Sequence, residues 1–371
     1  MTYDFAVIGA GMAGASIAAE LAGEARVLLL EAEDAPGYHA TGRSAAFWDE
    51  CYGGPGVVPL TLASGPYLRD HGFLTTRGAL HLGRASDRAA MDAFVATFAG
   101  TGVTIERLDR AAIEPRVPGL RSGWCEAIHE PACADIDVAG LHQHYLGQAR
   151  RSGVELVCRA QVAALVREPG GWRIVTEAGG EYRASKIVNA AGAWADPVAA
   201  LAGIAPLDIR PLRRTVVQLR VDPPAPADLP LVLDINGHFY FKPDNGRLWL
   251  SPHDEIPAEA GDAAPEELDV AIAIDRFEQA TSWRIEAVER RWAGLRSFAP
   301  DRLPVYGADP ADGSFFWFAG QGGFGIQTAP AAARLGAQLA LGQGRDAMTR
   351  NIDPAAYSPA RFHHENKLRT A

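Results

Sequence analysis

The first 31 residues constrain the fold of this chain more than any other stretch. An apolar run over residues 5–8 leads into Gly9, Gly11 and Gly14, a helical Ala, Ile and Leu pattern follows, and a second apolar run ends at Glu31. A strand, a glycine turn, a helix, a strand and a terminal acid in this order predict a βαβ unit with a dinucleotide-binding fingerprint. The alternative is a purely structural turn, because a glycine triplet by itself is weak evidence.

Each residue of this fingerprint has a physical role. Gly9 makes the tight turn out of the strand, Gly11 lets the backbone approach a pyrophosphate, and Gly14 lets the helix pack closely on the strand. The phosphates then lie at the helix N-terminus, where unpaired N–H groups favour negative charge. Glu31 is placed to accept the two hydroxyls of an adenosine ribose, and its charge repels a 2′-phosphate. We therefore expect a dinucleotide other than NADP.

Composition excludes several classes of function. The chain has 371 residues, 48% of them hydrophobic, which suits a globular protein of about two domains. Its net charge of -10 argues against a nucleic-acid surface. No apolar run approaches about 18 residues, so no membrane span is expected. Asp4 stands where a signal peptide would be basic, and we expect a soluble cytoplasmic protein.

The cysteines and histidines give no metal-binding pattern. The four cysteines have neither CxxC nor zinc-ligand spacing and are expected to be reduced structural thiols: Cys51, Cys125, Cys133 and Cys158. His142 and His144 form an HxH pair within a helical pattern. Residues two apart face different sides of a helix, so core or exposed histidines are favoured over a metal site. We expect no metal.

A loop rich in small residues follows Glu31 and is expected to lead into a helix. It spans residues 35–56, APGYHATGRSAAFWDECYGGPG. Residues 41–45 offer backbone N–H groups and two hydroxyls, a second phosphate cradle that a flavin dinucleotide needs more than NAD does. The alternative is an ordinary helix N-cap at Thr41 or Ser44.

GYHATGRSAA (residues 37–46), together with the opening fingerprint, resembles the flavin amine oxidoreductases related to D-amino-acid oxidase and glycine oxidase, and D-arginine dehydrogenase most closely. The resemblance continues in order along most of the chain. Its further pieces are ADIDVAGLHQHYL (134–146), IVNAAGAWAD (187–196), FYFKPDNG (239–246), WAGLRSFAPD (292–301) and GQGGFGIQTAPA (320–331). Each piece alone is weak evidence, and their combination is specific.

The resemblance implies an α/β protein with two discontinuous domains. A Rossmann-like FAD-binding domain is expected over residues 1–47, 135–210 and 303–371. A second, α+β substrate-binding domain with a mixed or antiparallel sheet is expected over 48–134 and 211–302. RRTVVQLRV and HFYFKP alternate as half-exposed strands do. The acidic run over 254–278 is expected to be a solvated loop and helix face without function, and Pro330 fixes the start of the last helix.

The cofactor implied by the resemblance is non-covalent FAD. In the family the last helix points its N-terminus at the flavin, where partial positive charge favours negative charge on the ring. His39 is ambiguous, because relatives acting on methylated glycines attach flavin through a histidine before a similar turn. The expected cofactor-binding residues are Gly9, Gly11, Met12, Ala13, Gly14, Glu31, Ala32, Thr41, Gly42, Arg43, Ser44, Ala45, Ala46, Val162, Ala190, Gly192, Trp194, Gly294, Gly322, Gly323, Gly325, Ile326, Gln327 and Thr328.

The substrate residues implied by the resemblance suit a carboxylate. Arg296 is expected to clamp it with a two-pronged guanidinium contact, and Tyr240 to donate a phenolic hydrogen bond. Tyr52 stands where the family has another substrate-contacting tyrosine. Either tyrosine could equally be a core aromatic. Arg214 is expected as a second cationic contact, and Arg213 stays an alternative because the intervening loop shifts the match by one residue.

Two departures from D-arginine dehydrogenase concern specificity. Ala79, in TTRGALHLG, replaces the acidic residue that pairs with the cationic side chain, and Phe47 replaces a histidine. Gln327 is also expected in the substrate pocket. Because a buried cation without a partner is costly, apolar or aromatic D-amino acids are expected. Restoring Glu at position 79 should raise the preference for D-arginine.

The function implied is oxidative deamination of a D-amino acid. Hydride passes from Cα to flavin N5, and the imino acid then hydrolyses to a 2-oxo acid and ammonia. The main alternative is a related flavin enzyme for a secondary amine, such as sarcosine, glycine or proline, or for a 2-hydroxy acid. A non-catalytic flavin-binding redox module is the third. The electron acceptor, whether oxygen, a quinone or a carrier, leaves no residue signature.

Overall fold

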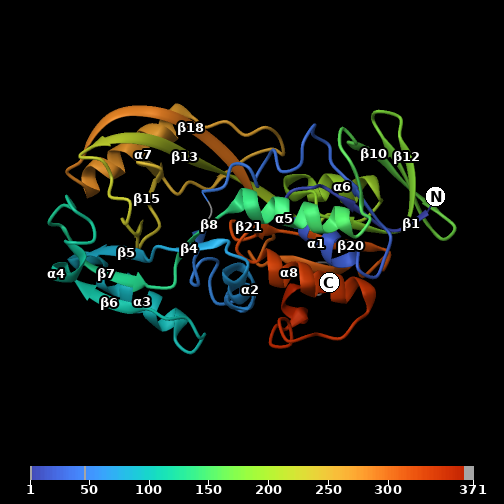
Figure 1. Cartoon of the computed structure of the whole chain (residues 1–371), viewed down its shortest axis with the longest axis horizontal. Coiled ribbons are helices and arrows are strands. Elements are labelled where there is room, and N and C mark those ends of the chain that lie inside the picture. The colour runs from blue at the N-terminus through green and yellow to red at the C-terminus, as the bar shows by residue number, and fades with distance from the viewer. Residues whose placement is uncertain (1, 46, 363–371) are drawn as a thin grey trace, which may run out of the picture.

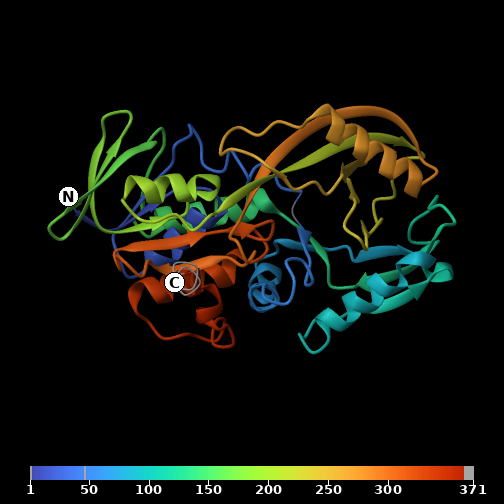
Figure 2. The ribbon, with the colours of Figure 1, turned by 180° about the vertical axis from the view of Figure 1, so that it is seen from behind.

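The computed structural model describes residues 2–45 and 47–362, and over these residues the strands form two large sheets joined by a small one. Figure 1 shows the two large sheets at opposite ends of the long axis, and Figure 2 shows the same division from behind. The described ends of the chain lie in the same half, with α1 and α8. None of the described helices is both long enough and apolar enough to cross a bilayer.

The first sheet is built on the predicted βαβ unit. β1 precedes the glycine turn and α1, β2 follows α1, and the two strands pair in parallel. β12 pairs in parallel with the other edge of β1. The strand order is β10-β11-β12-β1-β2-β9, with β20 beside β12 and β19 beside β20. The strand bounds are β1 Thr2–Ile8, β2 Val27–Leu30, β9 Glu155–Val157, β10 Val162–Glu168, β11 Gly171–Thr176, β12 Glu181–Asn189, β19 Val305–Ala308 and β20 Phe315–Ala319.

The register of this sheet aligns the carboxyl ends of its parallel strands. Ile8 is opposite both Leu30 and Asn189, and Asn189 is opposite Trp317. The chain therefore leaves β1, β2, β12 and β20 at one edge, which is where ligands bind in open α/β sheets.

Helices cover both faces of the first sheet, because successive strand side chains point to opposite sides. Val7 and Leu29 face α1, α5 and α8, whereas Ile8 and Leu30 belong to the opposite core cluster. α8 begins at Ala329 with Pro330 in its first turn, as predicted. The helix bounds are α1 Met12–Leu21, α5 Val138–Arg151, α6 Ala195–Leu201 and α8 Ala329–Leu341, with short 3-10 turns at Gly192–Trp194, Pro354–Tyr357 and Pro359–Phe362.

The larger sheet is antiparallel except where β14 pairs with β5. Its order is β21-β18-β13-β16-β15-β14-β5-β7-β6, with β17 on β13. The strand bounds are β5 Ala79–Arg84, β6 Glu106–Asp109, β7 Trp124–Glu130, β13 Arg210–Asp222, β14 Leu231–Asp234, β15 Tyr240–Asp244, β16 Arg247–Ser251, β17 Ile256–Pro257, β18 Arg284–Phe298 and β21 Gln321–Gly322. The helices of this half are the 3-10 turn Ala85–Asp87, α3 Arg88–Phe98, α4 Arg110–Ile113 and α7 Glu267–Ala280. α2 (Val58–Asp70) instead packs against α8 in the core of the first sheet.

Two connections place the sheets against one another. The small sheet of β3 (Phe47–Trp48), β8 (Ala134–Ile136) and β4 (Leu74–Thr76) lies between the halves. The long antiparallel pair of β13 and β18 runs from the first sheet to the far end of the second (Figure 1). The division into two discontinuous domains stays a prediction. The short strand β21, from the last segment of the chain, pairs with β18 of the larger sheet.

Three expectations about local structure are wrong. The RRTVVQLRV and HFYFKP strands are mostly buried rather than half-exposed: residues 213–217 and 239–243 are covered on both faces, on one side by α7 and its core cluster. The loop after Glu31 leads into β3 before α2 begins at Val58. The acidic run 254–278 is not simply solvated, because Asp254 accepts the Thr215 amide at 2.8 Å and Asp269 is buried against Arg213.

Candidate active site

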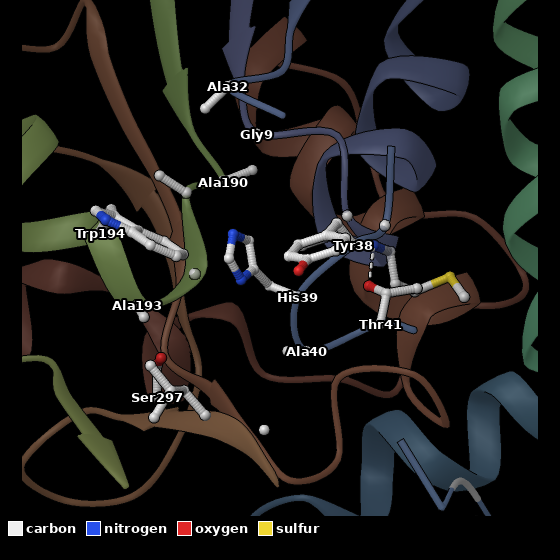
Figure 3. A pocket seen from close by; sticks show the side chains of 18 of the residues that line it. Gly9, Ala32, Tyr38, His39, Ala40, Thr41, Ala190, Ala193, Trp194 and Ser297 are labelled. Carbon is white, nitrogen blue, oxygen red and sulfur yellow. Dashed lines mark hydrogen bonds between the residues drawn. The ribbon is translucent and has the colours of Figure 1, made fainter. Parts of the chain in front are cut away.

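A cavity of about 620 Å³ opens at the carboxyl ends of the parallel strands. Both sheets line it, because β18 and β13 reach it from the larger sheet. Figure 3 shows the Tyr38–Thr41 loop, the turn after Ala190 and Ser297 of β18 around this space. A cavity of this size lies within the range of about 300–1,000 Å³ that is typical of small-molecule sites.

The fingerprint turn is as tight as its sequence predicts. Gly9 has a φ of +97°, and a Cβ there would lie 2.7 Å from the Ala190 carbonyl oxygen. A Cβ on Gly14 would lie 1.7 Å from the Gly9 oxygen. Gly11, Met12 and Ala13 line the cavity at the start of α1, whereas Gly14 lies behind them. The N-terminus of α1 is therefore presented to the cavity.

Glu31 is fixed at the end of β2 by the backbone. Its carboxylate oxygens accept the Ala10 amide at 2.8 Å and the Glu33 amide at 3.0 Å, and the side chain is buried at the cavity edge beside Ala32. Each oxygen keeps a further lone pair for a ligand hydroxyl. The geometry is that of an oriented hydroxyl acceptor.

The loop over residues 37–45 closes one side of the cavity. Thr41, Arg43, Ser44 and Ala45 line it, and Gly42 lies behind them with its amide on the Gly37 carbonyl. No described helix begins at Thr41 or Ser44. Instead the Thr41 hydroxyl accepts the Met12 amide of α1 at 2.9 Å (Figure 3). The remaining residue expected in this stretch, Ala46, lies outside the described residues.

His39 lines the cavity between two aromatic rings. Figure 3 shows it pointing inward between Trp194 and Tyr38, and its ring centroid is 4.7 Å from that of Trp194. Its Nε2 is 2.7 Å from a Glu33 oxygen, and its buried Nδ1 has no hydrogen-bond partner in the part of the chain that the structure describes. Sequence reasoning did not assign Tyr38 or Glu33 to the site, although both lie beside residues it did assign.

The turn after β12 brings further expected residues to the cavity. Ala190, Gly192 and Trp194 line it, and so does Val162 of β10. The buried Asn189 holds this turn, because its side chain donates to the Ala195 carbonyl at 2.7 Å.

The C-terminal glycine loop supplies most of the opposite wall. Gly294 on β18 and Gly322, Gly323, Gly325 and Ile326 before α8 line the cavity. Thr328 is fully buried and does not face it, since its hydroxyl donates to the Phe324 carbonyl at 2.8 Å. Gln327 is buried on the far side of the loop.

Four polar side chains meet at the substrate end. Arg296, Arg214 and Tyr240 line the main cavity, and Arg296 Nη1 donates to the Tyr52 hydroxyl at 2.7 Å. Arg214 donates through Nε to the Asp254 carbonyl at 2.6 Å, and its buried Nη1 has no hydrogen-bond partner among the described residues. Within residues 2–45 and 47–362 the buried Tyr240 hydroxyl has no hydrogen-bond partner either. Two directed donors are thus left unsatisfied in one cavity.

Strand geometry separates Arg214 from its neighbour. Because adjacent residues of β13 point to opposite faces, Arg213 turns away from the cavity. It binds Asp269 at 2.9 Å and also pairs with Glu266. Both arginines have acidic partners, because Arg214 lies 3.3 Å from Glu255 and 3.8 Å from Asp254, but Arg214 also lines the cavity.

The electrostatics of this end favour an anion. Burial and the nearby Arg296 lower the pKa of Arg214 to about 10. Burial, with Arg214 and Arg296 next in effect, lowers the pKa of His253 to about 3, so this histidine is neutral. A bound carboxylate would relieve the repulsion between the two guanidiniums.

Two of the three expected specificity residues lie together, and the third lies apart from them. Phe47, Tyr52 and Gln327 line a small cavity of about 20 Å³ beside Arg296. Ala79 is fully buried in β5, opposite Glu130, and is not among the described residues lining either cavity. Its role in specificity stays a prediction.

Sequence reasoning missed an acidic strap, residues 254–263, that crosses the cavity. Asp262 pairs with Arg43 and accepts the Tyr38 hydroxyl at 3.2 Å, and Gly261 and Ala263 line the cavity. Arg43 Nη1 also donates to the Ala263 carbonyl at 3.0 Å. No local signal marks the Asp262 contacts, because Tyr38 and Arg43 are more than 200 residues away along the chain.

The comparison with protein families decides the class. The profile described as DAO, FAD dependent oxidoreductase, matches residues 4–339. The chain belongs to this family of FAD-dependent oxidoreductases. The expected DAO family and its FAD cofactor are thereby confirmed, whereas the particular likeness to D-arginine dehydrogenase and the non-covalent binding of FAD stay predictions.

Curated relatives of this FAD-dependent oxidoreductase are distant. It is 28% identical to the tRNA 5-methylaminomethyl-2-thiouridine biosynthesis bifunctional protein of Polaromonas sp., over 89% of this chain and 55% of that protein. It is 27% identical to L-2-hydroxyglutarate dehydrogenase of Escherichia coli (55% and 51%) and 26% identical to glycine oxidase of Pseudomonas aeruginosa (66% and 65%). The chain thus spans about half to two thirds of the length of these relatives.

Solved structures show the fold. Glycine oxidase from Geobacillus kaustophilus has a TM-score of 0.83 at 24% identity, covering 97% of this chain and 99% of its own. L-Proline dehydrogenase from P. horikoshii has a TM-score of 0.84 at 22% identity, covering 98% of each chain. The predicted α/β class, with mixed sheets, is confirmed.

The residues around the cavity of the FAD-dependent oxidoreductase fit FAD. Gly9 and Gly14 leave no room for a Cβ, which keeps the backbone at the N-terminus of α1 close to the cavity. Glu31 offers fixed acceptors for ribose hydroxyls, and the unpartnered His39 Nδ1 lies inside the cavity. Together, the helix N-terminus, the Glu31 acceptors and the His39 nitrogen suit a bound dinucleotide.

We expect Asp262→Asn to release FAD about two- to fivefold faster than the unchanged protein. The contact is exposed on the aspartate side, so the loss is the small one expected of a surface ion pair. The recovery of free-FAD fluorescence after dilution measures it. Asp275→Asn, on the exposed side of α7, is the control. Equal release rates for the two variants would show that the contact between Asp262 and Arg43 does not slow the release of FAD.

Proposed function

We propose that this chain oxidises a small α-amino acid held by its carboxylate, and that the substrate is a D-amino acid with an apolar or aromatic side chain. The observation that carries the proposal is the pair of unsatisfied, buried donors, Arg214 Nη1 and Tyr240 Oη, in the cavity that Arg296 also lines. Unpaired buried donors cost about 1–3 kcal/mol each, so a ligand with acceptor oxygens offsets that cost.

Arg296 is the main anchor in this proposal. Its guanidinium matches a carboxylate in two-pronged geometry, and the Tyr52 hydroxyl at 2.7 Å limits its rotation. Arg214 and Tyr240 supply the further hydrogen bonds. A carboxylate held this way leaves the amine and the Cα–H facing the rest of the cavity, and orientation of this kind contributes much of the rate.

FAD would be held by the turn at Gly9 and Gly11, by Glu31, by the loop at Thr41–Ala45 and by the glycine loop before α8. The chemistry it supplies when bound is two-electron oxidation. The chain's own residues bind and orient the substrate, and the strap at Asp262 limits access of water. The imino acid product then hydrolyses to a 2-oxo acid and ammonia.

The wall beside the anchor supports an apolar side chain. Tyr240 and Val216 belong to one apolar cluster with Leu231 and Leu233, and Phe47 packs against it. The Phe47 ring centroid is 5.7 Å from that of Tyr240. The resemblance to D-arginine dehydrogenase is what favours the D enantiomer.

A second candidate is oxidation of a secondary amine or a 2-hydroxy acid. It is supported by the glycine oxidase, L-proline dehydrogenase and L-2-hydroxyglutarate dehydrogenase among the similar proteins. A carboxylate anchor suits all of these substrates equally. A non-catalytic flavin-binding module would have no use for two unsatisfied donors beside Arg296.

The test is an anaerobic titration of the holoenzyme with D- and L-amino acids, sarcosine, proline and 2-hydroxy acids. We expect D-amino acids with apolar side chains to bleach the flavin absorbance at the lowest concentrations. Bleaching by sarcosine, proline or a 2-hydroxy acid alone would replace the first candidate by the second. Admitting air afterwards separates oxygen from other acceptors.

We expect acid precipitation to release all of the yellow cofactor into the supernatant. His39 Nε2 is engaged by Glu33 at 2.7 Å, and its Nδ1 is free to donate to or accept from the cofactor without a covalent bond. Flavin absorbance measures the partition. Colour that stays with the pellet in the unchanged protein and leaves it in His39→Asn would establish a covalent link instead.

A further inference from the structure

Behind the Tyr52 turn lies a buried cluster of Asp49, His81 and Glu130. They come from the turn after β3, from β5 and from β7, and one ligand-type atom of each lies within 4.8 Å of the others. Asp49 and Glu130 are each 1% exposed. His81 is opposite Leu233, which is opposite Tyr240, so the cluster continues the sheet face that carries the substrate residues.

Hydrogen bonds connect the cluster residues to one another and to the backbone of the turn at Cys51 and Tyr52. His81 Nε2 is 2.5 Å from Glu130 Oε1, and the Cys51 amide donates to Glu130 Oε2 at 3.3 Å. Asp49 Oδ1 accepts the amides of Cys51 at 2.8 Å and Tyr52 at 2.9 Å. The Asp49 carboxyl group therefore shapes the turn that carries Tyr52.

Gln327 fastens the same turn from the other side. Its amide oxygen accepts the Asp49 N–H at 3.2 Å, and its amide nitrogen donates to the Asp49 carbonyl at 3.1 Å and to the Thr61 hydroxyl at 2.9 Å. A Cβ on Gly323 would lie 1.9 Å from the Tyr52 hydroxyl oxygen. The Tyr52 hydroxyl therefore lies close against the backbone at Gly323.

Two buried carboxyl groups in contact need a proton between them. Burial, and then Glu130, raise the pKa of Asp49 well above its ordinary value, and burial raises the pKa of Glu130 to about 7. Burial lowers the pKa of His81, which is therefore neutral and donates to Glu130. Among the described residues, the other titratable groups facing the pair are Glu50, Cys51 and Cys133.

We propose that Asp49 is a positioning residue that acts in its protonated form. Its hydroxyl donates to Glu130, its carbonyl oxygen holds the Cys51 and Tyr52 amides, and the turn so fixed sets the Tyr52 hydroxyl against Arg296. The proposal rests on the carboxylate anchor of the proposed function. It extends that anchor from four residues at the cavity to a hydrogen-bonded support behind them.

The test uses propionate, a carboxylate without an amine, bound to the holoenzyme and followed by the shift in flavin absorbance. Asp49→Asn keeps both an acceptor oxygen and a donor, so we expect affinity within about twofold of the unchanged protein. Asp49→Ala removes both and should weaken binding about tenfold. The control is Asp309→Asn, since Asp309 is buried and accepts the Ala311 amide at 2.9 Å in a similar turn.

A pH series adds a measurement that mere destabilisation would not move. Above pH 7 the ionised Glu130 accepts a charge-assisted hydrogen bond from Asp49, and such bonds are roughly twice as strong as neutral ones. As the pH falls through about 7, Glu130 takes up a proton and this bond weakens. Propionate affinity should then fall about threefold, and Glu130→Gln should flatten the profile.

Several results would overturn the proposal. Equal losses in Asp49→Asn and Asp49→Ala, or no loss in Asp49→Ala, would show that protonated Asp49 is not the support. A divalent metal retained at one equivalent and lost in His81→Ala would make the cluster a metal site. If the unchanged protein does not bind propionate, the anchor itself fails. In that case the infrared band of a buried protonated carboxyl group at pH 8, lost in Asp49→Asn, still decides the state of Asp49.

Discussion

Replacing Arg296 by alanine is expected to lower kcat/KM for the amino-acid substrate by about 100- to 1,000-fold. Truncating one partner of a buried, hydrogen-bonded charge pair costs about 2–5 kcal/mol, because the carboxylate loses its two-pronged contact in a dry site. Arg296→Lys keeps the charge but not the fork, so its loss should be intermediate. Steady-state kinetics on preparations of equal FAD content measure both effects.

The matched control for this prediction is Arg291→Ala on the same strand. Arg291 is half exposed and lies 3.7 Å from Glu267, away from the cavity, so its removal should change kcat/KM less than twofold. If Arg296→Ala turns over substrate at the rate of Arg291→Ala, the carboxylate anchor is in another place.

Replacing Gly14 by alanine is expected to yield protein that retains almost no FAD. The new Cβ would lie 1.7 Å from the Gly9 carbonyl oxygen, so the turn or α1 must move. Overpacking of this kind costs about 1–3 kcal/mol in stability, and the displaced turn moves the N-terminus of α1 away from the cavity. The ratio of flavin to protein absorbance, with thermal unfolding of the apoprotein, measures the result.

Gly23→Ala is the matched control for this second substitution. Gly23 follows the same helix, and a Cβ there would meet nothing within 4 Å. That variant should keep full FAD content and an unchanged melting temperature. A Gly14→Ala preparation as yellow as the Gly23→Ala one would show that the cofactor does not depend on this turn.

The cofactor half could be predicted from the sequence because its signals are local. The strands around Gly9, the acid at Glu31 and the helix start at Pro330 each follow from residues near one another in the chain. The register that brings Asn189 opposite Ile8 does not, because it depends on pairing between strands 181 residues apart.

The substrate end could be predicted only in part. Arg296 and Tyr52 are 244 residues apart, so their contact leaves no trace in local sequence. The choice between Arg213 and Arg214 depended on which face of β13 each occupies, and acidic partners on the far face hold Arg213. The acidic run was misjudged because charge alone favours solvent, whereas Asp254 and Asp262 have specific partners in the fold.

The continuity of β18 makes tolerance to insertions uneven along this chain. Arg296 lies opposite Leu212 near the end of a pairing that extends to Arg284 and Asp222. Because strand side chains alternate, one added residue between the middle of β18 and Arg296 would turn the guanidinium to the other face of the sheet. In proteins descended from this one, insertions and deletions should therefore be found mainly in the connection after Asp222. Added residues there leave the orientation of the Arg296 guanidinium unchanged.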